Sequence, residues 1–300
     1  MQGFLLLKKP KGITSFSAVS RIKRLVGERR VGHTGTLDPM ATGVLPIFLG
    51  KATALCGLLL DGNKRYTAEV KLGITTDTDD ITGTVLRESE VNISNDSLKA
   101  ALEHFKGKIK QKPPIYSALK KDGVRFYDLA RSGKTVNIPE REVEVFAIDL
   151  LSVLDENNCF TVDVSVSKGT YIRSLARDIG EYLGCGATLT ALERTETCGF
   201  NIGECTDLDD LDEQNICEKI VSEENAVLNL RECRVTEKQA IRFCNGGQLS
   251  FERLHINSFA ENELVRVKFG NIFLGIGSAD LEKNQLNIKC IINDYKAVAE

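Results

Sequence analysis

The chain has 300 residues, 42% hydrophobic and 27% charged, with a net charge of −3, which is ordinary for a soluble globular protein long enough for two domains. No apolar run approaches the length of a membrane span, and residues 4–7 are too short to form the core of a signal peptide. These properties exclude a membrane-spanning protein and predict a cytoplasmic one.

The first half of the chain alternates predicted strands with capped helices. The strands show either a continuous apolar run or an alternation of apolar and polar residues, and the helices show apolar residues at helical spacing behind a hydroxyl cap. The predicted strands cover residues 5–7, 44–49 and 66–72, and the predicted helices follow a cap at Thr14 or Ser15 and cover residues 94–105.

The loop before the strand at residues 44–49 has the sequence His-Thr-Gly-Thr-Leu-Asp-Pro at residues 33–39. Proline holds the residue before it in extended or turn geometry, so the backbone of Asp38 is restricted. Gly35 and Gly43 allow turns or close approaches that other residues resist. The pattern favours a loop that holds one carboxylate in a fixed direction. A simple Asx-turn, in which Asp38 only bonds its own backbone, is the alternative.

Residues 113–141 form a predicted insertion between regular elements. The stretch from Lys106 to Arg141 holds ten basic and three acidic residues, with three aromatic residues among them. Basic side chains interleaved with aromatic ones suit phosphate contact and base stacking. We expect a mobile loop with a short helix near residues 126–131 that contacts nucleic acid, and a solvated charged surface is the alternative.

An alternating strand is predicted at residues 160–166, followed by a turn and by a helix over residues 175–183 that Gly184 closes. Tyr171 and Arg173 lie two positions apart between the turn and the helix. On an extended segment, side chains two positions apart share one face of the strand.

The C-terminal part differs in composition from the rest. The second half of the chain holds 15 basic against 25 acidic residues, whereas the first half holds 24 against 17. Residues 204–224, with nine acidic residues and one basic residue, are interpreted as an acidic linker. A helix and several short strands then predict a small β-rich domain over residues 230–300. They are a helix at residues 237–243 and strands at residues 265–269, 273–277 and 286–292.

Four polar residues lie at the edges of otherwise apolar elements, namely Asp38, Tyr66, Tyr171 and Arg173. An arginine that faces an aspartate keeps the carboxylate ionised, and a tyrosine ring can stack on a base while its hydroxyl bonds elsewhere. Together these groups suit covalent or acid–base chemistry on a nucleotide. Sheet packing of the two tyrosines and a surface ion pair of the arginine stay open as alternatives.

Nine cysteines and three histidines are scattered along the chain without a Cys-x-x-Cys pair. The sequence therefore predicts neither a zinc site nor another metal site, and free buried thiols in a reducing compartment are expected. A catalytic cysteine is the alternative, although no cysteine lies in a distinctive Gly-rich turn near a histidine.

Seven short motifs follow one another along the chain, at residues 9–15, 33–46, 64–66, 73–78, 114–120, 167–173 and 184–187. In this order they resemble the TruB family of tRNA pseudouridine synthases. The motifs cover the chain from its first strand to about residue 200. Residues 230–300 match more loosely, by position and β-rich pattern, the small PUA-type RNA-binding domain that ends many such chains.

The resemblance implies an α+β pseudouridine-synthase fold, with a central mixed, mainly antiparallel sheet flanked by helices and a small β-rich PUA-like domain. Residues 1–229 would form the catalytic domain, and residues 230–300 would bind RNA. The implied reaction is a cofactor-independent isomerisation of uridine at position 55 in the tRNA T-loop. The base flips out, its glycosidic bond breaks, and a bond re-forms at C5. We expect a monomer that needs no guide RNA.

The resemblance also implies a role for each candidate site residue. Asp38 would be the catalytic aspartate, and Arg173 would pair with it. Among the other substrate-binding residues, Tyr66 and Tyr171 would hold the flipped uracil, and Leu192 would line the pocket. His33 would stack against RNA near the vacated position. Lys9 and Lys120 would help to organise the site and the RNA contact.

Two other functions stay open at this point. A guide-RNA-dependent rRNA pseudouridylase subunit of archaea or eukaryotes shares the aspartate loop, but the insertion at residues 113–141 and the short terminal domain favour the stand-alone bacterial form. A non-catalytic tRNA-binding or folding chaperone would keep its function when Asp38 is replaced, and both roles can coexist in one protein.

Overall fold

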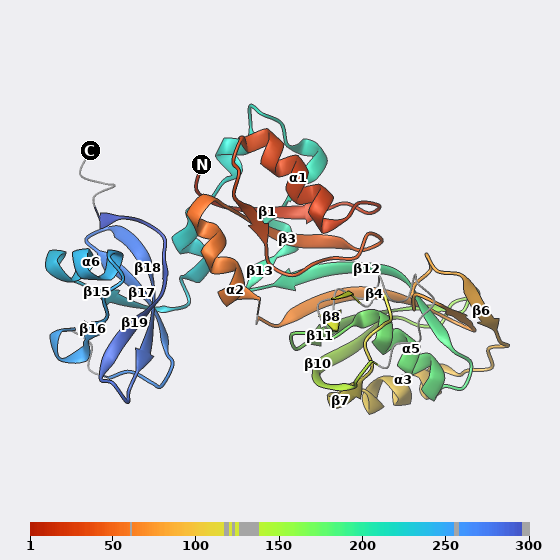
Figure 1. Cartoon of the computed structure of the whole chain (residues 1–300). Helices are drawn as coiled ribbons and strands as arrows, with labels where there is room; N and C mark the ends of the chain where they lie inside the picture. The colour runs from red at the N-terminus through yellow and green to blue at the C-terminus, as the bar shows by residue number, and fades with distance from the viewer. Residues whose placement is uncertain (61, 117–119, 122–123, 126–137, 255–257, 296–300) are drawn as a thin grey trace.

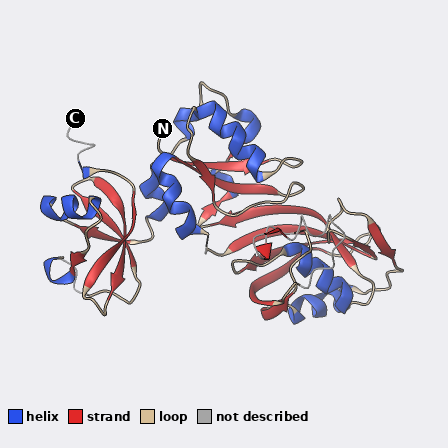
Figure 2. Cartoon of the chain, in the orientation of Figure 1, coloured by secondary structure: helices blue, strands red, loops and turns tan. Residues whose placement is uncertain are grey.

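The computed structural model describes residues 1–300 except 61, 117–119, 122–123, 126–137, 255–257 and 296–300. Within this part, the chain forms a large β-sheet unit followed by a small one (Figure 1). Helices lie on the outside of the strands in both units (Figure 2). Among the helices that the structure describes, none combines the length and the apolar composition of a membrane span.

The large unit is built on a ten-stranded sheet. Its strands are β1 (Gly3–Lys9), β2 (Val31–His33), β3 (Thr42–Leu49), β4 (Lys64–Leu72), β7 (Gly107–Gln111), β10 (Arg141–Ser152), β11 (Cys159–Val166), β12 (Ala187–Thr197), β13 (Phe200–Asn201) and β14 (Thr206–Asp207). The main path runs β14–β1–β3–β12–β4–β11–β10–β7, with β2 beside β3 and β13 beside β12. Only β1–β14 and β3–β12 pair in parallel among these described strands, which confirms the predicted mixed, mainly antiparallel sheet.

Helices α1 (Ser15–Val26), α3 (Asn95–His104) and α5 (Ile172–Tyr182) flank this sheet. Thr14 caps α1, because its hydroxyl accepts a hydrogen bond from the backbone N–H of Ser17 at 3.0 Å. Ser94 caps α3 in the same way at 3.1 Å. Both caps and both helices were predicted from the sequence, and each helix packs its apolar stripe against the core.

The small unit contains a five-stranded sheet and helix α6 (Glu237–Cys244). Its strands follow the spatial order β15–β17–β18–β19–β16, and they are β15 (Arg231–Arg234), β16 (Leu249–Ser250), β17 (Leu264–Phe269), β18 (Ile272–Asp280) and β19 (Gln285–Ile291). These elements confirm the small β-rich domain expected at the C-terminal end.

The remaining elements are short. They are α2 (Cys56–Leu59), the ribbon of β5 (Ile74–Thr76) and β6 (Val85–Glu88), the ribbon of β8 (Lys120–Lys121) and β9 (Val124–Arg125), and the 3₁₀ turns η1 (Gly50–Leu55), η2 (Ile202–Glu204), η3 (Leu208–Asp210), η4 (Ile216–Lys219), η5 (Glu223–Val227) and η6 (Phe251–Arg253).

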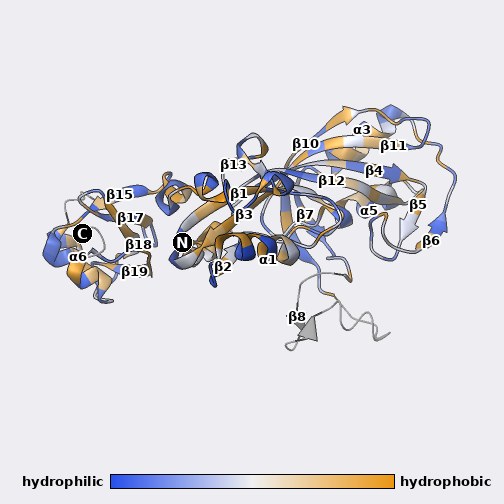
Figure 3. Ribbon diagram, turned by 90° about the horizontal axis from the view of Figure 1, so that it is seen from above, coloured by the Kyte–Doolittle hydropathy of each residue, from blue (hydrophilic) through white to orange (hydrophobic). Residues whose placement is uncertain are grey.

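An apolar cluster joins the two units. Figure 3 shows apolar residues along β1 and β3, and side chains of these strands belong to a buried cluster that also contains residues of η1, η5 and the small unit. Phe4 and Phe48 stack with ring centroids 5.4 Å apart, and they share a buried cluster with Phe273 and Ile276 of β18. Burial of such large side chains from both units stabilises their contact by the hydrophobic effect.

Residues 204–224 pack against the rest of the chain. Their interpretation as a linker is therefore wrong, because a linker would lie free in solvent. Leu208, Leu211 and Ile216 are buried in the core of the large unit. Glu224 forms ion pairs with Arg266 at 2.6 Å and with Lys268 at 2.9 Å. Acidic residues dominate the composition of this segment, but an apolar residue recurs every few positions. These apolar residues fix the segment to the large unit.

The start of α5 also differs from the prediction. The helix begins at Ile172, so Tyr171 precedes it in extended conformation and Arg173 lies in its first turn. The two side chains therefore do not share a strand face. The reason is that Ile172, together with Leu175, belongs to the apolar stripe that the helix buries.

The predicted insertion at residues 113–141 is described only in part. The backbone of β8 and β9 forms an antiparallel ribbon that the sequence did not predict. The short helix expected near residues 126–131 lies outside the described residues.

Candidate active site

Three hydrogen bonds from Ser15 and Gly12 fix the loop that carries Asp38. The Ser15 hydroxyl donates to the carbonyl oxygen of Leu37 at 3.0 Å and accepts from its N–H at 2.8 Å. The N–H of Gly12 donates to the carbonyl oxygen of Pro39 at 2.8 Å. The residues on both sides of Asp38 are therefore held, so the carboxylate has a fixed direction.

Lys9 lies directly under this loop. Its side chain is fully buried, and Nζ donates to the carbonyl oxygens of Pro10 and Ile13, both at 2.8 Å. Burial lowers the pKa of Lys9 to about 8, although the Asp38 carboxylate acts in the opposite direction. Lys9 thus has the contacts of a residue that organises the loop. The ammonium group does not reach the surface, so any effect of Lys9 on bound RNA would act through the loop.

Arg173 links three parts of the chain at the start of α5. Its Nε lies 2.8 Å from Oδ2 of Asp38, and Nη2 donates to Oδ1 at 3.2 Å. Nη1 lies 3.7 Å from Oδ2 of Asp80 and donates to the carbonyl oxygen of Thr78 at 3.1 Å. Nη2 also donates to the carbonyl oxygen of Tyr116 at 3.0 Å. The Arg173 side chain is 5% exposed, so salt screens these charge-assisted contacts weakly.

The carboxyl group of Asp38 experiences opposing effects. Burial raises its pKa above the ordinary aspartate value, and the nearby carboxylate of Asp80 adds to the rise. The positive charge of Arg173 lowers the pKa of Asp38. Ionisation of Asp38 therefore depends on Arg173, as expected for a carboxylate that faces a buried guanidinium group.

Arg194 ties both ends of the Asp38 loop to β12. It is almost fully buried, and it lies directly opposite Tyr66 of the neighbouring strand β4. Nε donates to the carbonyl oxygen of Val44 at 2.9 Å, and Nη2 donates to that of Gly35 at 3.0 Å. Burial raises the pKa of Tyr66 above its ordinary value, so the phenol stays protonated near neutral pH.

Gly43 allows β3 to approach the backbone of β12 at this point. Its φ is +105°, and a Cβ would overlap the backbone atoms of Arg194. We expect Gly43→Ala to lower the free energy of unfolding by about 2–5 kcal/mol, from backbone strain and overlap together, as measured by urea unfolding. Gly12→Ala is the matched control, because Gly12 has a φ of +91° and no atom within 4 Å of the added Cβ. Equal losses in both variants would contradict the close approach.

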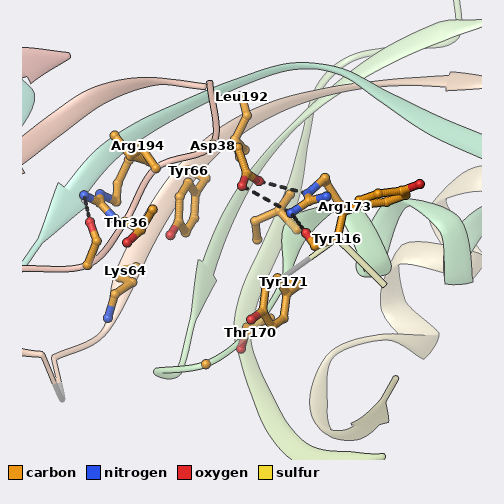
Figure 4. A pocket seen from close by; sticks show the side chains of 14 residues that line it. Thr36, Asp38, Lys64, Tyr66, Tyr116, Thr170, Tyr171, Arg173, Leu192 and Arg194 are labelled. Carbon is orange, nitrogen blue, oxygen red and sulfur yellow. Dashed lines mark hydrogen bonds and ion pairs between the residues drawn. The ribbon is translucent and has the colours of Figure 1, made fainter. Parts of the chain in front are cut away.

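A pocket of about 250 Å³ lies beside Asp38 and Arg173 (Figure 4). Figure 4 shows Asp38 joined to Arg173, with Tyr66 from β4 and Tyr171, the residue before α5, lining the same pocket. The pocket is lined by Gly35, Thr36, Leu37, Asp38, Lys64, Tyr66, Tyr116, Gly169, Thr170, Tyr171, Ile172, Arg173, Leu192 and Arg194. Among the described residues, no group of three or more His, Cys, Asp or Glu side chains is placed to hold a metal ion.

The structure brings together five of the eight predicted site residues. They are Asp38, Tyr66, Tyr171, Arg173 and Leu192. His33 lies on β2, immediately before the loop, but it does not line the pocket. Burial lowers the pKa of His33, so its ring is neutral at physiological pH. Lys120 lies on β8, and its side chain is outside the described part of the chain.

Sequence reasoning missed three buried polar residues around the site, namely Asp80, Gln111 and Arg194. The sequence could have indicated Arg194, because it stands two positions after the predicted pocket residue Leu192. On a strand, the two side chains therefore lie on the same face. Asp80 follows the motif at residues 73–78, but its contact with Arg173 joins distant parts of the chain. Gln111 had no signal, since nothing in the sequence places it beside Tyr171.

Comparisons with known proteins identify the family of the chain. Residues 23–172 match the family model described as "TruB family pseudouridylate synthase (N terminal domain)", and residues 173–233 match "tRNA pseudouridylate synthase B C-terminal domain". The protein named tRNA pseudouridine synthase B in Clostridium acetobutylicum is 43% identical over 283 residues, which cover 94% of this chain and 97% of the relative. The protein of the same name in Clostridioides difficile is 39% identical over 297 residues, covering 96% and 98%.

A solved structure has the same fold over almost the whole chain. It is described as "Crystal Structure of a Cbf5-Nop10-Gar1 Complex", and the matched chain superposes with a TM-score of 0.76 at 26% identity. The match covers 98% of this chain and 86% of the other. The fold is therefore that of pseudouridine synthases, and the chain belongs to the TruB family of pseudouridylate synthases.

Proposed function

We propose that this pseudouridine synthase isomerises the uridine at position 55 in the T-loop of tRNA. The observation that carries the proposal is the Asp38–Arg173 ion pair, which lies with Tyr66 and Tyr171 in one small pocket. The name of the bacterial relatives, tRNA pseudouridine synthase B, supports tRNA as the substrate.

The reaction breaks the bond between N1 of uracil and C1′ of the ribose and forms a bond between C5 and C1′. C5 loses its proton and N1 gains one, so the isomerisation is balanced without an oxidant or a reductant. An ionised carboxylate beside the bound nucleotide can donate an electron pair or accept a proton. We therefore assign Asp38 as the catalytic residue, and Arg173 keeps it ionised and oriented.

The target base must leave the folded T-loop before it can enter the pocket. Extrusion of a stacked base costs a few kcal/mol. In the proposal, the rings of Tyr66 and Tyr171 and the apolar side chain of Leu192 contact the extruded uracil and offset part of this cost. The half-buried, neutral ring of His33 stacks against the RNA near the vacated position.

We also propose that two parts of the chain have different functions. Residues 1–229 carry the catalytic site, and residues 230–300 form a PUA-like RNA-binding domain. In support, β15 begins a separate sheet at Arg231. A hollow on the small unit is lined by Lys238, Arg242 and Arg253, whose positive charge suits RNA phosphates. The basic composition of residues 113–141, with Lys120 among them, supports a further RNA contact.

The proposed enzyme acts as a monomer in the cytoplasm, where tRNA is found, and needs no guide RNA. The matched chain of the solved structure described as "Structure of H/ACA RNP bound to a substrate RNA containing 2'-deoxyuridine" has 25% sequence identity to this chain. The similarity to the Clostridium acetobutylicum relative, at 43%, is greater, which favours the stand-alone form.

The test is incubation of the purified chain with an unmodified T-arm transcript, followed by chemical mapping of pseudouridine. We expect one pseudouridine, at the T-loop uridine, and none in a transcript that carries cytidine there. Absence of product from this bare RNA would contradict the stand-alone function. Faster tRNA folding without product, equal in the wild type and in Asp38→Asn, would identify a chaperone instead.

A further inference from the structure

Gln111 is a buried amide that holds the backbone of Tyr171. It is the last residue of β7, and it is fully buried. Its Oε1 accepts a hydrogen bond from the N–H of Tyr171 at 2.8 Å, and its Nε2 donates to the carbonyl oxygen of the same residue at 3.0 Å. One carboxamide thus satisfies both backbone groups of a single residue, as a neighbouring strand would.

Tyr171 needs such a partner because of its position. It immediately precedes α5, its backbone is extended with φ −101° and ψ 115°, and its side chain does not cap the helix. The N–H of a residue before a helix has no partner within the helix. The two bonds from Gln111 fix φ and ψ at Tyr171, and these angles set the direction in which the ring leaves the backbone.

Arg141 holds the ring of Tyr171 from another side. Arg141 lies directly opposite Gln111 in the β7–β10 pair, and its guanidinium carbon is 4.7 Å from the centroid of the Tyr171 ring. A guanidinium group at this distance over an aromatic face is attracted to it. Two neighbouring residues of one strand pair therefore hold the backbone and the ring of a residue that lines the pocket.

We propose that Gln111 is a positioning residue for the isomerisation and acts through Tyr171, an inference that rests on the proposed function. The amide sets the direction of the Tyr171 ring and so aligns the extruded uracil with the Asp38 carboxylate. A displacement of about 1 Å at such a position can reduce a rate by about 100-fold, because the reacting atoms lose their alignment.

The experiment compares Gln111→Met with Ser174→Ala. Methionine has a similar length and removes both hydrogen bonds. Ser174 is the matched control, because it is also fully buried and also joins α5 to the end of β7, through a 2.9 Å hydrogen bond to the carbonyl oxygen of Lys112. Its side chain makes no bond to the backbone of Tyr171 among the described contacts. For each variant, the single-turnover rate at saturating T-arm RNA, the RNA dissociation constant and the melting temperature are measured.

We expect Gln111→Met to lower the single-turnover rate by about 10- to 100-fold while RNA affinity changes less than about threefold. Ser174→Ala should keep the wild-type rate even if its melting temperature falls as far as that of Gln111→Met. Gln111→Glu is the second variant, since an ionised glutamate keeps an acceptor for the Tyr171 N–H but loses the donor, and its rate should also fall below that of the wild type.

An unchanged rate in both Gln111 variants, or an equal loss of rate in Ser174→Ala, would overturn the inference. If Gln111→Met does not fold, the rate of Gln111→Glu relative to Ser174→Ala decides in the same way. Failure of the proposed function has a different signature, because the wild-type chain itself would then form no pseudouridine.

Discussion

Replacement of Asp38 by asparagine is expected to reduce pseudouridine formation by about 10⁴-fold or more, a loss of the order seen when a catalytic carboxylate becomes an amide. The amide keeps the shape of the side chain, but it cannot donate an electron pair or accept a proton as the carboxylate does. RNA affinity should change little, because most of the RNA contact lies outside this group. Single-turnover assays and a binding titration with T-arm RNA measure the two effects separately.

Asp38→Glu is a useful companion to this variant. It keeps the charge and the pairing with Arg173, but it moves the carboxylate by one methylene group. We expect a rate between those of the wild type and Asp38→Asn, because orientation contributes separately from charge. Appreciable turnover by Asp38→Asn would remove Asp38 from the catalytic role.

Replacement of Arg173 by methionine is expected to affect both stability and pH dependence. The change leaves the carboxylates of Asp38 and Asp80 without their shared partner. Loss of one member of a buried ion pair lowers the free energy of unfolding by about 3–5 kcal/mol. Urea unfolding near neutral pH, where both carboxyl groups are ionised in the unfolded chain, measures this loss.

The pH dependence of Arg173→Met follows from the pKa of Asp38. Burial raises that pKa and Arg173 lowers it, so removal of the arginine raises the pKa further. Because the ionised form is the active one, the acid limb of the rate profile should move to higher pH. RNA affinity at neutral pH should fall less than the rate.

Arg177→Met is the matched control for this prediction. Arg177 lies one turn later on α5 and pairs with Asp79 and Asp178, each at 2.8 Å, but it does not line the pocket. We expect a smaller loss of stability and an unchanged acid limb. A shift of the limb in Arg177→Met as large as that in Arg173→Met would contradict a specific pairing of Arg173 with Asp38.

Local pattern was sufficient to predict many elements of the fold. Alternation of apolar and polar residues predicted β4 and β11, and hydroxyl caps predicted α1 and α3. The position of Asp38 between a glycine-flanked turn and a proline indicated a fixed carboxylate. These signals are readable because each depends on neighbours within a few residues.

Non-local contacts could not be predicted in this way. Gln111 reaches Tyr171, Asp80 reaches Arg173, and residues 204–224 pack into the large unit, each through contacts between distant parts of the sequence. Composition even favoured a wrong interpretation of residues 204–224, because their charges dominate the count while a few buried apolar side chains determine the packing.

The sheet order has a consequence for synthesis of the chain on the ribosome. β12, from residues 187–197, lies between β3 and β4, which are made much earlier (Figure 1). Until β12 emerges, the sheet halves that carry Asp38 and Tyr66 have unpaired inner edges, and such edges invite pairing with other chains. Closure of the sheet is therefore a late folding event, and a nascent chain that stops before β12 lacks the strand that holds the aspartate loop and the tyrosine together.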